Sequence, residues 1–266
     1  MLHNSLLIRD RLRATNNDEL HRGRRDPHRW LGLLAGPDPR AGEIALTGAW
    51  SVLAVGSMPG LDEACADLTE FLTRGGVAVS DNADLRIQLE QRGDVEFGCH
   101  RRIANTRAIS IQASDPTGMW AGVVDLERTI ALRRSPVLPE GTVERSPRWP
   151  VQISQAPFGA NYLVPDLSAD FLSDDVFRLL AHFGVNGMTI YGDWLLYVDH
   201  LSYPELSHPD AVEHLATLQD AARRAMRYGV RLYFVPVSPK LTADHPIFQR
   251  LPGLRGARIH TGLVKD

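Results

Sequence analysis

The sequence is poor in cysteine, and this scarcity narrows the class of protein. Only Cys65 and Cys99 are present among 266 residues, so at most one disulfide could form. A single disulfide would stabilise a chain of this length only weakly. Two thiols also cannot build a structural zinc site of the kind that needs three or four cysteines. A reducing, cytoplasmic compartment is therefore the expected location.

Long apolar runs are also missing. The first segment, MLHNSLLIRDRLR, has only Leu6–Ile8 as an apolar stretch before Arg9, well short of the roughly 7 to 15 residues of a signal-peptide core. No later run approaches the roughly 18 apolar residues of a membrane span. We therefore expect a soluble protein with neither a signal peptide nor a membrane partner.

The chain has no excess of charge of either sign. Its 29 Lys and Arg residues face 32 Asp and Glu residues, for a net charge of -3. A global basic field that would attract nucleic acid is thus absent, and we expect no nucleic-acid partner. The arginines near the N-terminus alternate with acids, which predicts a solvated, partly disordered leader over residues 1–44, with a basic docking arm as the alternative.

Residues 45–135 have the pattern of an α+β domain. WSVLAV is an apolar, β-branched run, and after the turn GSMPG the segment LDEACADLTEFLTRGG repeats apolar residues at helical spacing. VAVS, LRIQLE and AISIQAS resemble further strands, and Asp115-Pro116 is a start signal for a second helix. We predict an α+β sandwich with its helices on one face of the sheet.

The pattern of apolar residues changes after residue 135. SPVLPEGTVERSPRWP has four prolines and a glycine, which predicts an irregular linker over residues 136–150. Beyond it, strand and helix patterns alternate as far as VRLYFVPVS, which is typical of parallel strands with right-handed crossovers. A complete (β/α)8 barrel needs roughly 200 to 250 residues. For residues 151–266 we therefore expect an incomplete barrel of about three βα units.

The strand AISIQAS, the Asp-Pro turn, the following helix, the proline-rich joint and the barrel-like repeats together resemble glycoside hydrolases of the β-N-acetylhexosaminidase type and, less closely, α-glucuronidases. Both families place a small α+β domain before a catalytic TIM barrel. The likeness covers roughly residues 45–255 and lies mainly in Ile109–Ser114, Asp115–Gly118 and Gly122–Leu126. It implies a scaffolding helix packed between sheet and barrel through five apolar residues: Met119, Trp120, Val123, Leu126 and Leu132.

Several family features are missing at the matching places. Hexosaminidases have a sugar-clamping Arg after the joint, whereas this chain has Pro150–Gln155. The segment VPVSPKLTADHPIF keeps Pro236 and His245 but lacks the acids that end the family's third strand. No Asp-Glu pair occurs in residues 151–266, so the resemblance identifies no catalytic acids.

Barrel enzymes bind their ligands at the C-terminal ends of the strands, which selects candidates by position. The candidates for substrate binding are Gln155 after the first strand, Tyr191, Asp193 and Trp194 after the second, and His245 after the third. An aromatic face and a carboxylate, as in Asp193-Trp194, suit a sugar ring and its hydroxyls. The alternative for each residue is an ordinary loop or cap role. We identify no metal ligand and expect no cofactor.

The leading hypothesis is that the chain is the N-terminal portion of a hexosaminidase-like glycosidase that binds or hydrolyses carbohydrate. On this hypothesis the three βα units lack the catalytic acid pair and the rest of the barrel. A second is a non-catalytic carbohydrate-binding or assembly protein whose exposed strand edge pairs with another copy, forming a homo-oligomer. A third is a complete small hydrolase with unrecognised acids. None of the three specifies a sugar or a linkage.

Overall fold

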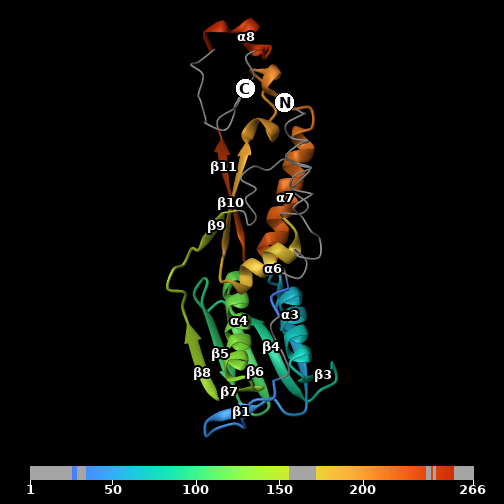
Figure 1. Cartoon of the computed structure of the whole chain (residues 1–266), viewed down its shortest axis with the longest axis vertical. Helices are drawn as coiled ribbons and strands as arrows, with labels where there is room; N and C mark the ends of the chain where they lie inside the picture. The colour runs from blue at the N-terminus through green and yellow to red at the C-terminus, as the bar shows by residue number, and fades with distance from the viewer. Residues whose placement is uncertain (1–25, 29–33, 156–171, 238–240, 242–243, 255–266) are drawn as a thin grey trace.

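A computed structural model of the chain describes residues 26–28, 34–155, 172–237, 241 and 244–254. Figure 1 shows two parts stacked along the long axis of the molecule. The lower part contains a six-stranded sheet, and the upper part contains a three-stranded sheet with a long helix beside it. The mixed α/β class expected from the sequence is confirmed. No helix within the described residues combines the length and the apolar character that crossing a bilayer requires.

The six-stranded sheet has the order β3-β2-β4-β6-β5-β8. Its strands are β2 (Ala49–Val55), β3 (Ala78–Val79), β4 (Leu85–Gln91), β5 (His100–Ala104), β6 (Ala108–Ala113) and β8 (Gly141–Arg145). The first four in the spatial order pair in parallel, whereas β5 and β8 are antiparallel to their neighbours. Apolar residues two apart share a face, as the buried pairs Ile87 with Ile109 and Leu89 with Ile111 illustrate.

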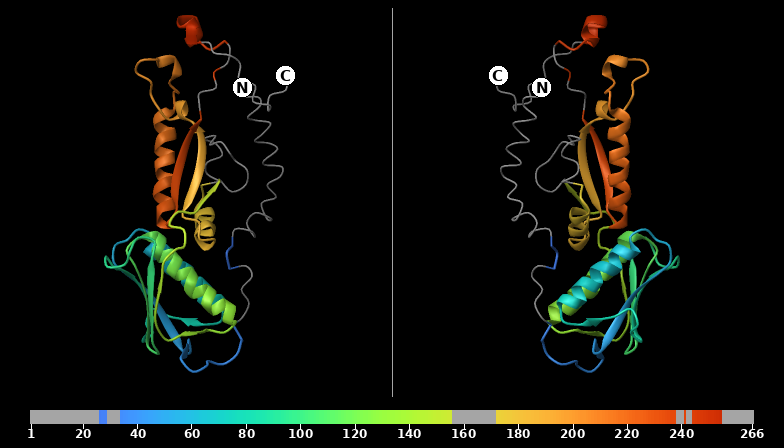
Figure 2. Two further views of the ribbon diagram at one scale, coloured as in Figure 1. Left: turned by 90° about the vertical axis from the view of Figure 1, so that its left-hand side faces the viewer. Right: turned by 90° about the vertical axis from the view of Figure 1, so that its right-hand side faces the viewer.

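Helices α3 (Leu61–Arg74) and α4 (Pro116–Arg133) lie together on one face of this sheet (Figure 2). The Asp-Pro signal for the second helix is confirmed. The Asp115 carboxylate accepts a hydrogen bond from the Gly118 backbone N–H at 3.1 Å and a second from the Gly98 N–H at 2.7 Å. The same side chain therefore caps α4 and ties its first turn to the loop before β5.

The stretch expected to be an irregular linker contains two strands. Strand β7 (Val137–Pro139) pairs with β1 (Glu43–Ala45), and β8 pairs with β5 along the edge of the large sheet. Within β8 only Val143 is even partly buried. The strand therefore lacks the apolar alternation that identifies a half-buried strand in sequence, and backbone pairing defines it instead.

The expected leader is partly structured where it is described. Residues 1–25 and 29–33 lie outside the described residues, but Pro27 and His28 between them are buried. Asp26 forms an ion pair with Arg74 of α3 at 2.6 Å. The prediction of a solvated leader is therefore wrong for residues 26–28, because these residues pack against the helices of the α+β part.

The upper sheet has the order β9-β10-β11, all parallel, as the alternation of strands and helices predicts. Its strands are β9 (Ile153–Gln155), β10 (Gly187–Asp193) and β11 (Arg231–Val237). Helix α6 (Asp174–His182) precedes β10, and α7 (Ala211–Arg227) precedes β11 and runs beside the strands (Figure 1). The remaining short elements are η2 (Trp194–Leu196), η3 (Pro204–Leu206), α8 (Ile247–Arg250) and η4 (Pro252–Leu254).

The two parts meet where the N-terminal ends of α3 and α4 touch the C-terminal end of α7. The Trp120 indole N–H donates to the Arg227 carbonyl at 2.7 Å, and the Thr117 hydroxyl donates to the Gly229 carbonyl at 2.9 Å. Gly60 has a φ of 87°, and a Cβ there would lie 1.8 Å from the Arg227 carbonyl oxygen. Only a residue without a side chain permits this approach.

Four of the five α4 residues expected to pack are buried. Met119, Trp120, Val123 and Leu126 are buried, and Trp120 also packs against Tyr228. Leu132 is 80% exposed, so its assignment to the packed face is wrong. It lies in the last turn of α4, where most of its side chain faces solvent.

Candidate functional site

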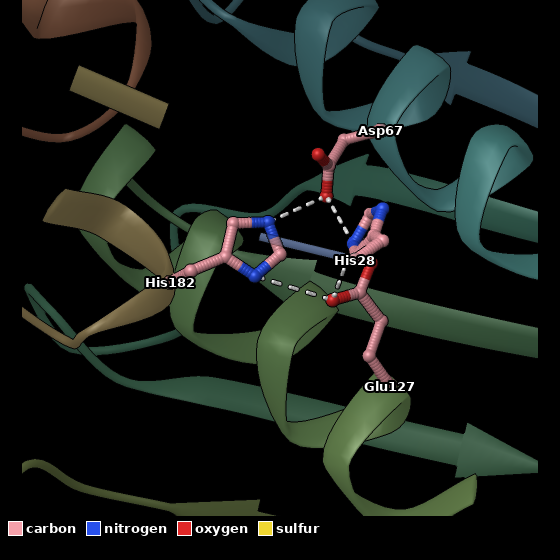
Figure 3. Close-up of side chains that lie close together, drawn as sticks. All are labelled: His28, Asp67, Glu127 and His182. Carbon is pink, nitrogen blue, oxygen red and sulfur yellow. Dashed lines mark hydrogen bonds and ion pairs between the residues drawn. The ribbon is translucent and has the colours of Figure 1, made fainter. Parts of the chain in front are cut away.

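Four side chains of metal-binding type meet between the two parts of the molecule (Figure 3). His28 comes from the N-terminal segment, Asp67 from α3, Glu127 from α4 and His182 from the last residue of α6. Their side chains are at most 11% exposed. We name these four residues the junction cluster.

The side chains of the junction cluster face one another closely. The Nε2 atom of His28 lies 3.4 Å from Glu127 Oε2 and 3.7 Å from Asp67 Oδ2. The Nε2 atom of His182 lies 3.0 Å from Asp67 Oδ2, and its Nδ1 atom lies 3.5 Å from Glu127 Oε2. Two imidazoles and two carboxylates from four separate segments thus surround one small volume.

Arg178 of α6 supplies the full positive charge closest to these carboxylates. Its guanidinium donates to Asp67 Oδ1 and, at 2.6 Å, to Glu70. Burial by itself would raise the pKa of Asp67, but hydrogen bonding to His182 and the charge of Arg178 bring that pKa below its ordinary value. Arg178 therefore holds one oxygen of Asp67, while the other faces the two histidines.

Burial shifts the pKa values of Glu127 and His28 so that the neutral form of each is favoured. It raises the pKa of Glu127, with a further contribution from the neighbouring charge of Asp67. Burial also lowers the pKa of His28 to about 4, so this imidazole is neutral at neutral pH. The Oε1 atom of Glu127 is buried and, within the part of the chain that the structure describes, accepts no hydrogen bond.

A cavity of about 430 Å³ adjoins the cluster. Glu127 and His182 line it, together with Asp26 and the apolar side chains of Leu179 and Phe183. The cluster can therefore be reached from the cavity by a small solute or ion.

Sequence reasoning missed all four residues, although two of them carry a signal. Asp67 lies three residues after Ala64 and four before Phe71, on the buried stripe of its helix. Glu127 likewise lies on the buried stripe of α4, four residues after Val123 and three before Ile130. A carboxylate at an apolar position needs a partner. His28 belongs to no comparable pattern.

The candidates chosen from the sequence lie at the ends of the parallel strands. Gln155 is opposite Thr189, the Tyr191 backbone is opposite Val235, and Asp193, the last residue of β10, is opposite Val237. Trp194 follows at once as the first residue of η2. The side chains of Gln155, Tyr191, Asp193 and Trp194 lie outside the described part of the structure.

His245 has a local role in the structure. Its Nδ1 atom accepts a hydrogen bond from the Ile247 backbone N–H at 3.3 Å, and its ring lies 6.4 Å from that of Phe248. It therefore caps the first turn of α8. An ion pair between Arg250 and Glu205 at 2.5 Å joins α8 to the segment that follows β10.

The segment between β10 and α7 is ordered by polar contacts. The Ser207 hydroxyl donates to Asp199 at 2.8 Å and accepts from the His200 backbone N–H at 2.7 Å. His214 Nδ1 lies 2.9 Å from the Leu196 carbonyl. These contacts fix the conformation of the segment that follows Asp193-Trp194.

Comparison with known proteins gives a likeness of fold. No protein-family model and no curated protein matches the chain. A GH138 enzyme that targets the pectin rhamnogalacturonan II superposes with a TM-score of 0.57 and 12% sequence identity, over 77% of this chain and 33% of the enzyme. The chain thus spans about a third of that enzyme's length.

Two further solved structures are β-N-acetylhexosaminidases. The enzyme from Bacteroides fragilis has a TM-score of 0.46 and 14% identity, over 76% of this chain and 42% of its own. The GH20 enzyme from Streptomyces coelicolor has a TM-score of 0.44 and 17% identity, over 77% and 45%. Neither structure identifies catalytic residues in this chain.

Proposed function

We propose that this chain supplies the small α+β domain and three βα units of a glycoside hydrolase-type barrel, and that it binds carbohydrate at the C-terminal ends of β9, β10 and β11. The observation that carries the proposal is the order of the two parts. An α+β sheet precedes three parallel strands in register, and this arrangement superposes on a carbohydrate-active enzyme with a TM-score of 0.57.

The strand ends are the natural place for a ligand. In parallel α/β sheets the carboxyl ends of the strands lie at the same edge, and the connections that follow them form the binding site. Here the register brings the ends of β10 and β11 level, at Asp193 and Val237. The proposal assigns Asp193 and Trp194 to sugar hydroxyls and to the sugar's C–H face, with Gln155, Tyr191 and His245 as further contacts.

Binding, and not hydrolysis, is the activity that we propose for this chain by itself. Most glycosidases hold two carboxyl groups at a fixed separation across the scissile bond. No Asp-Glu pair occurs in residues 151–266, and no catalytic pair is assigned. We therefore propose that turnover uses acids from outside the three βα units.

Isothermal titration calorimetry of the whole chain tests this proposal. Oligosaccharides from rhamnogalacturonan II, the polysaccharide that the GH138 enzyme targets, are the first ligands to titrate, followed by N-acetylglucosamine oligomers. We expect saturable binding that weakens at least about tenfold in Asp193→Asn and in Trp194→Ala, because each change removes one direct contact.

Trp149→Ala is the matched control. Trp149 is 63% exposed and precedes β9, so it belongs to the opposite end of the strand from the proposed site. Its substitution should leave the affinity unchanged. Absence of binding to every oligosaccharide, or equal loss in Trp149→Ala and Trp194→Ala, would contradict the proposal.

Self-assembly is the alternative function, and the exposed apolar residues of the upper sheet favour it. Ile153 of β9 is 50% exposed and Val235 of β11 is 37% exposed. Among the described residues β9 and β11 each pair with β10 alone. A defined dimer in light scattering, lost in Val235→Lys, would support assembly through this sheet.

A further inference from the structure

The junction cluster has the ligand types of a divalent transition-metal site. Imidazole nitrogen and carboxylate oxygen are both ligands of zinc, which prefers four of them in a tetrahedral arrangement. His28, Asp67, Glu127 and His182 each offer one such atom, and these atoms lie within 4.8 Å of one another. No cysteine is needed for this set, so the shortage of thiols does not exclude it.

The distances between the ligand atoms approach those of a tetrahedral ion. Zinc bonds of roughly 2.0 to 2.1 Å imply separations of about 3.3 Å between neighbouring ligand atoms. The Asp67 oxygen Oδ2 lies 3.0 Å from His182 Nε2 and 3.7 Å from His28 Nε2, and Glu127 Oε2 lies 3.4 Å from His28 Nε2. One ligand atom from each residue lies within 4.8 Å of every other, so the widest separations must shorten when an ion binds.

The polar atoms of the cluster could be satisfied by a cation. Asp67 and Glu127 are buried side by side, and Arg178 is already engaged with Asp67 and Glu70. Glu127 retains a buried oxygen without a hydrogen-bond donor among the described residues. A buried carboxyl oxygen without a partner is costly, and a cation bound to Glu127 lowers that cost.

We propose that the junction cluster binds one Zn²⁺ ion through His28, Asp67, Glu127 and His182, and that this ion joins the N-terminal segment and the α+β part to α6 of the upper part. Four protein ligands leave no open coordination position, which is typical of a structural rather than a catalytic zinc. Arg178 holds the second oxygen of Asp67 and thereby orients its metal-binding oxygen. The adjoining cavity provides a route of entry.

Metal titration of the whole chain tests the proposal. The purified chain is stripped with a chelator, and Zn²⁺ is then titrated in competition with a chromophoric indicator. We expect one high-affinity ion per chain and a rise in melting temperature on binding. Co²⁺ in place of Zn²⁺ should give the intense visible absorption of a tetrahedral site.

Glu127→Gln and His182→Gln are the test variants, because each removes one ligand at nearly constant volume. Both should weaken Zn²⁺ binding by on the order of 100-fold or more. Changing a residue that only supports a metal ligand costs about 10- to 100-fold, and loss of a ligand itself should cost at least as much. His214→Gln is the control. His214 belongs to a second group, with His208 and Asp210, that is more exposed, and its change should leave the stoichiometry and affinity of the junction site intact.

Circular dichroism of each variant separates loss of the site from loss of the fold. If His182→Gln does not fold, Glu127→Gln and the Co²⁺ spectrum of the unsubstituted chain decide the question. Failure to bind Zn²⁺ in the stripped chain, or affinity that Glu127→Gln does not change, would overturn the proposal. The cluster would then be a metal-free ion-pair network in which His182 bridges the two carboxylates.

Discussion

Gly60 tests whether the two parts of the molecule are packed against each other as described. Gly60 has a φ of 87°, and a Cβ there would lie 1.8 Å from the Arg227 carbonyl oxygen, whereas an ordinary contact begins at 3.4 Å. In Gly60→Ala the end of α7 must therefore retreat. That movement also stretches the 2.7 Å hydrogen bond from the Trp120 indole to the same carbonyl.

A control glycine separates the destabilisation expected for Gly60→Ala into a backbone contribution and a steric contribution. Gly42 has a φ of 78° and nothing within 4 Å of its added Cβ. Gly42→Ala therefore has only the backbone cost of a left-handed residue, about 1 kcal/mol after the gain from a stiffer unfolded chain. Gly60→Ala has this cost plus about 1 to 3 kcal/mol for the steric conflict, for a total of about 2 to 4 kcal/mol.

Urea unfolding followed by circular dichroism measures both variants on the whole chain. The expected result is a lower free energy of unfolding for Gly60→Ala than for Gly42→Ala, by about 1 to 3 kcal/mol at unchanged slope. Equal values for the two variants would refute the reasoning, because the conflict with Arg227 would then not exist in solution.

Two other changes test the buried interior. Trp120→Phe removes the donor to the Arg227 carbonyl and should lower the free energy of unfolding by about 1 to 3 kcal/mol, measured by thermal or urea unfolding. Trp149→Phe changes an exposed tryptophan and should alter the free energy of unfolding by less than about 0.5 kcal/mol. Burial raises the pKa of the Cys65 thiol to about 12, so at pH 8.5 on the order of one thiol in three thousand is the reactive thiolate. Peptide mapping should find iodoacetamide on Cys65 only after unfolding, and rapid labelling of the native chain would contradict this burial.

The secondary structure was predictable wherever apolar periodicity and capping residues agree. The stripe of α3, the Asp115-Pro116 start of α4 and the alternation of β9, α6, β10, α7 and β11 all follow from the sequence. Strands β5 and β8 were not predicted. The buried face of β5 contains the polar residues His100 and Arg102, whereas β8 is almost wholly exposed and pairs through its backbone. A strand with no buried face leaves no pattern in the choice of residues.

The junction cluster was less predictable than the helices that carry it. Its carboxylates lie on helix faces that local periodicity identifies, but their partners are distant in sequence, by 115 positions between His182 and Asp67 and by 99 between His28 and Glu127. His28 lies in an arginine-rich stretch that predicts solvation, yet it is 1% exposed. Only the packing of α6 onto α3 and α4 brings these groups together. The strand-end candidates could be chosen by position alone, and their role as a sugar site stays a prediction.

Nuclear magnetic resonance of the tryptophan indole N–H groups tests the carbohydrate proposal at the level of single residues. The chain has five tryptophans, and Trp→Phe variants assign their indole signals. On titration with an oligosaccharide, the Trp194 signal should shift and saturate, while that of the buried Trp120 stays in place. A titration that leaves Trp194 unmoved at millimolar oligosaccharide would contradict carbohydrate binding at the strand ends.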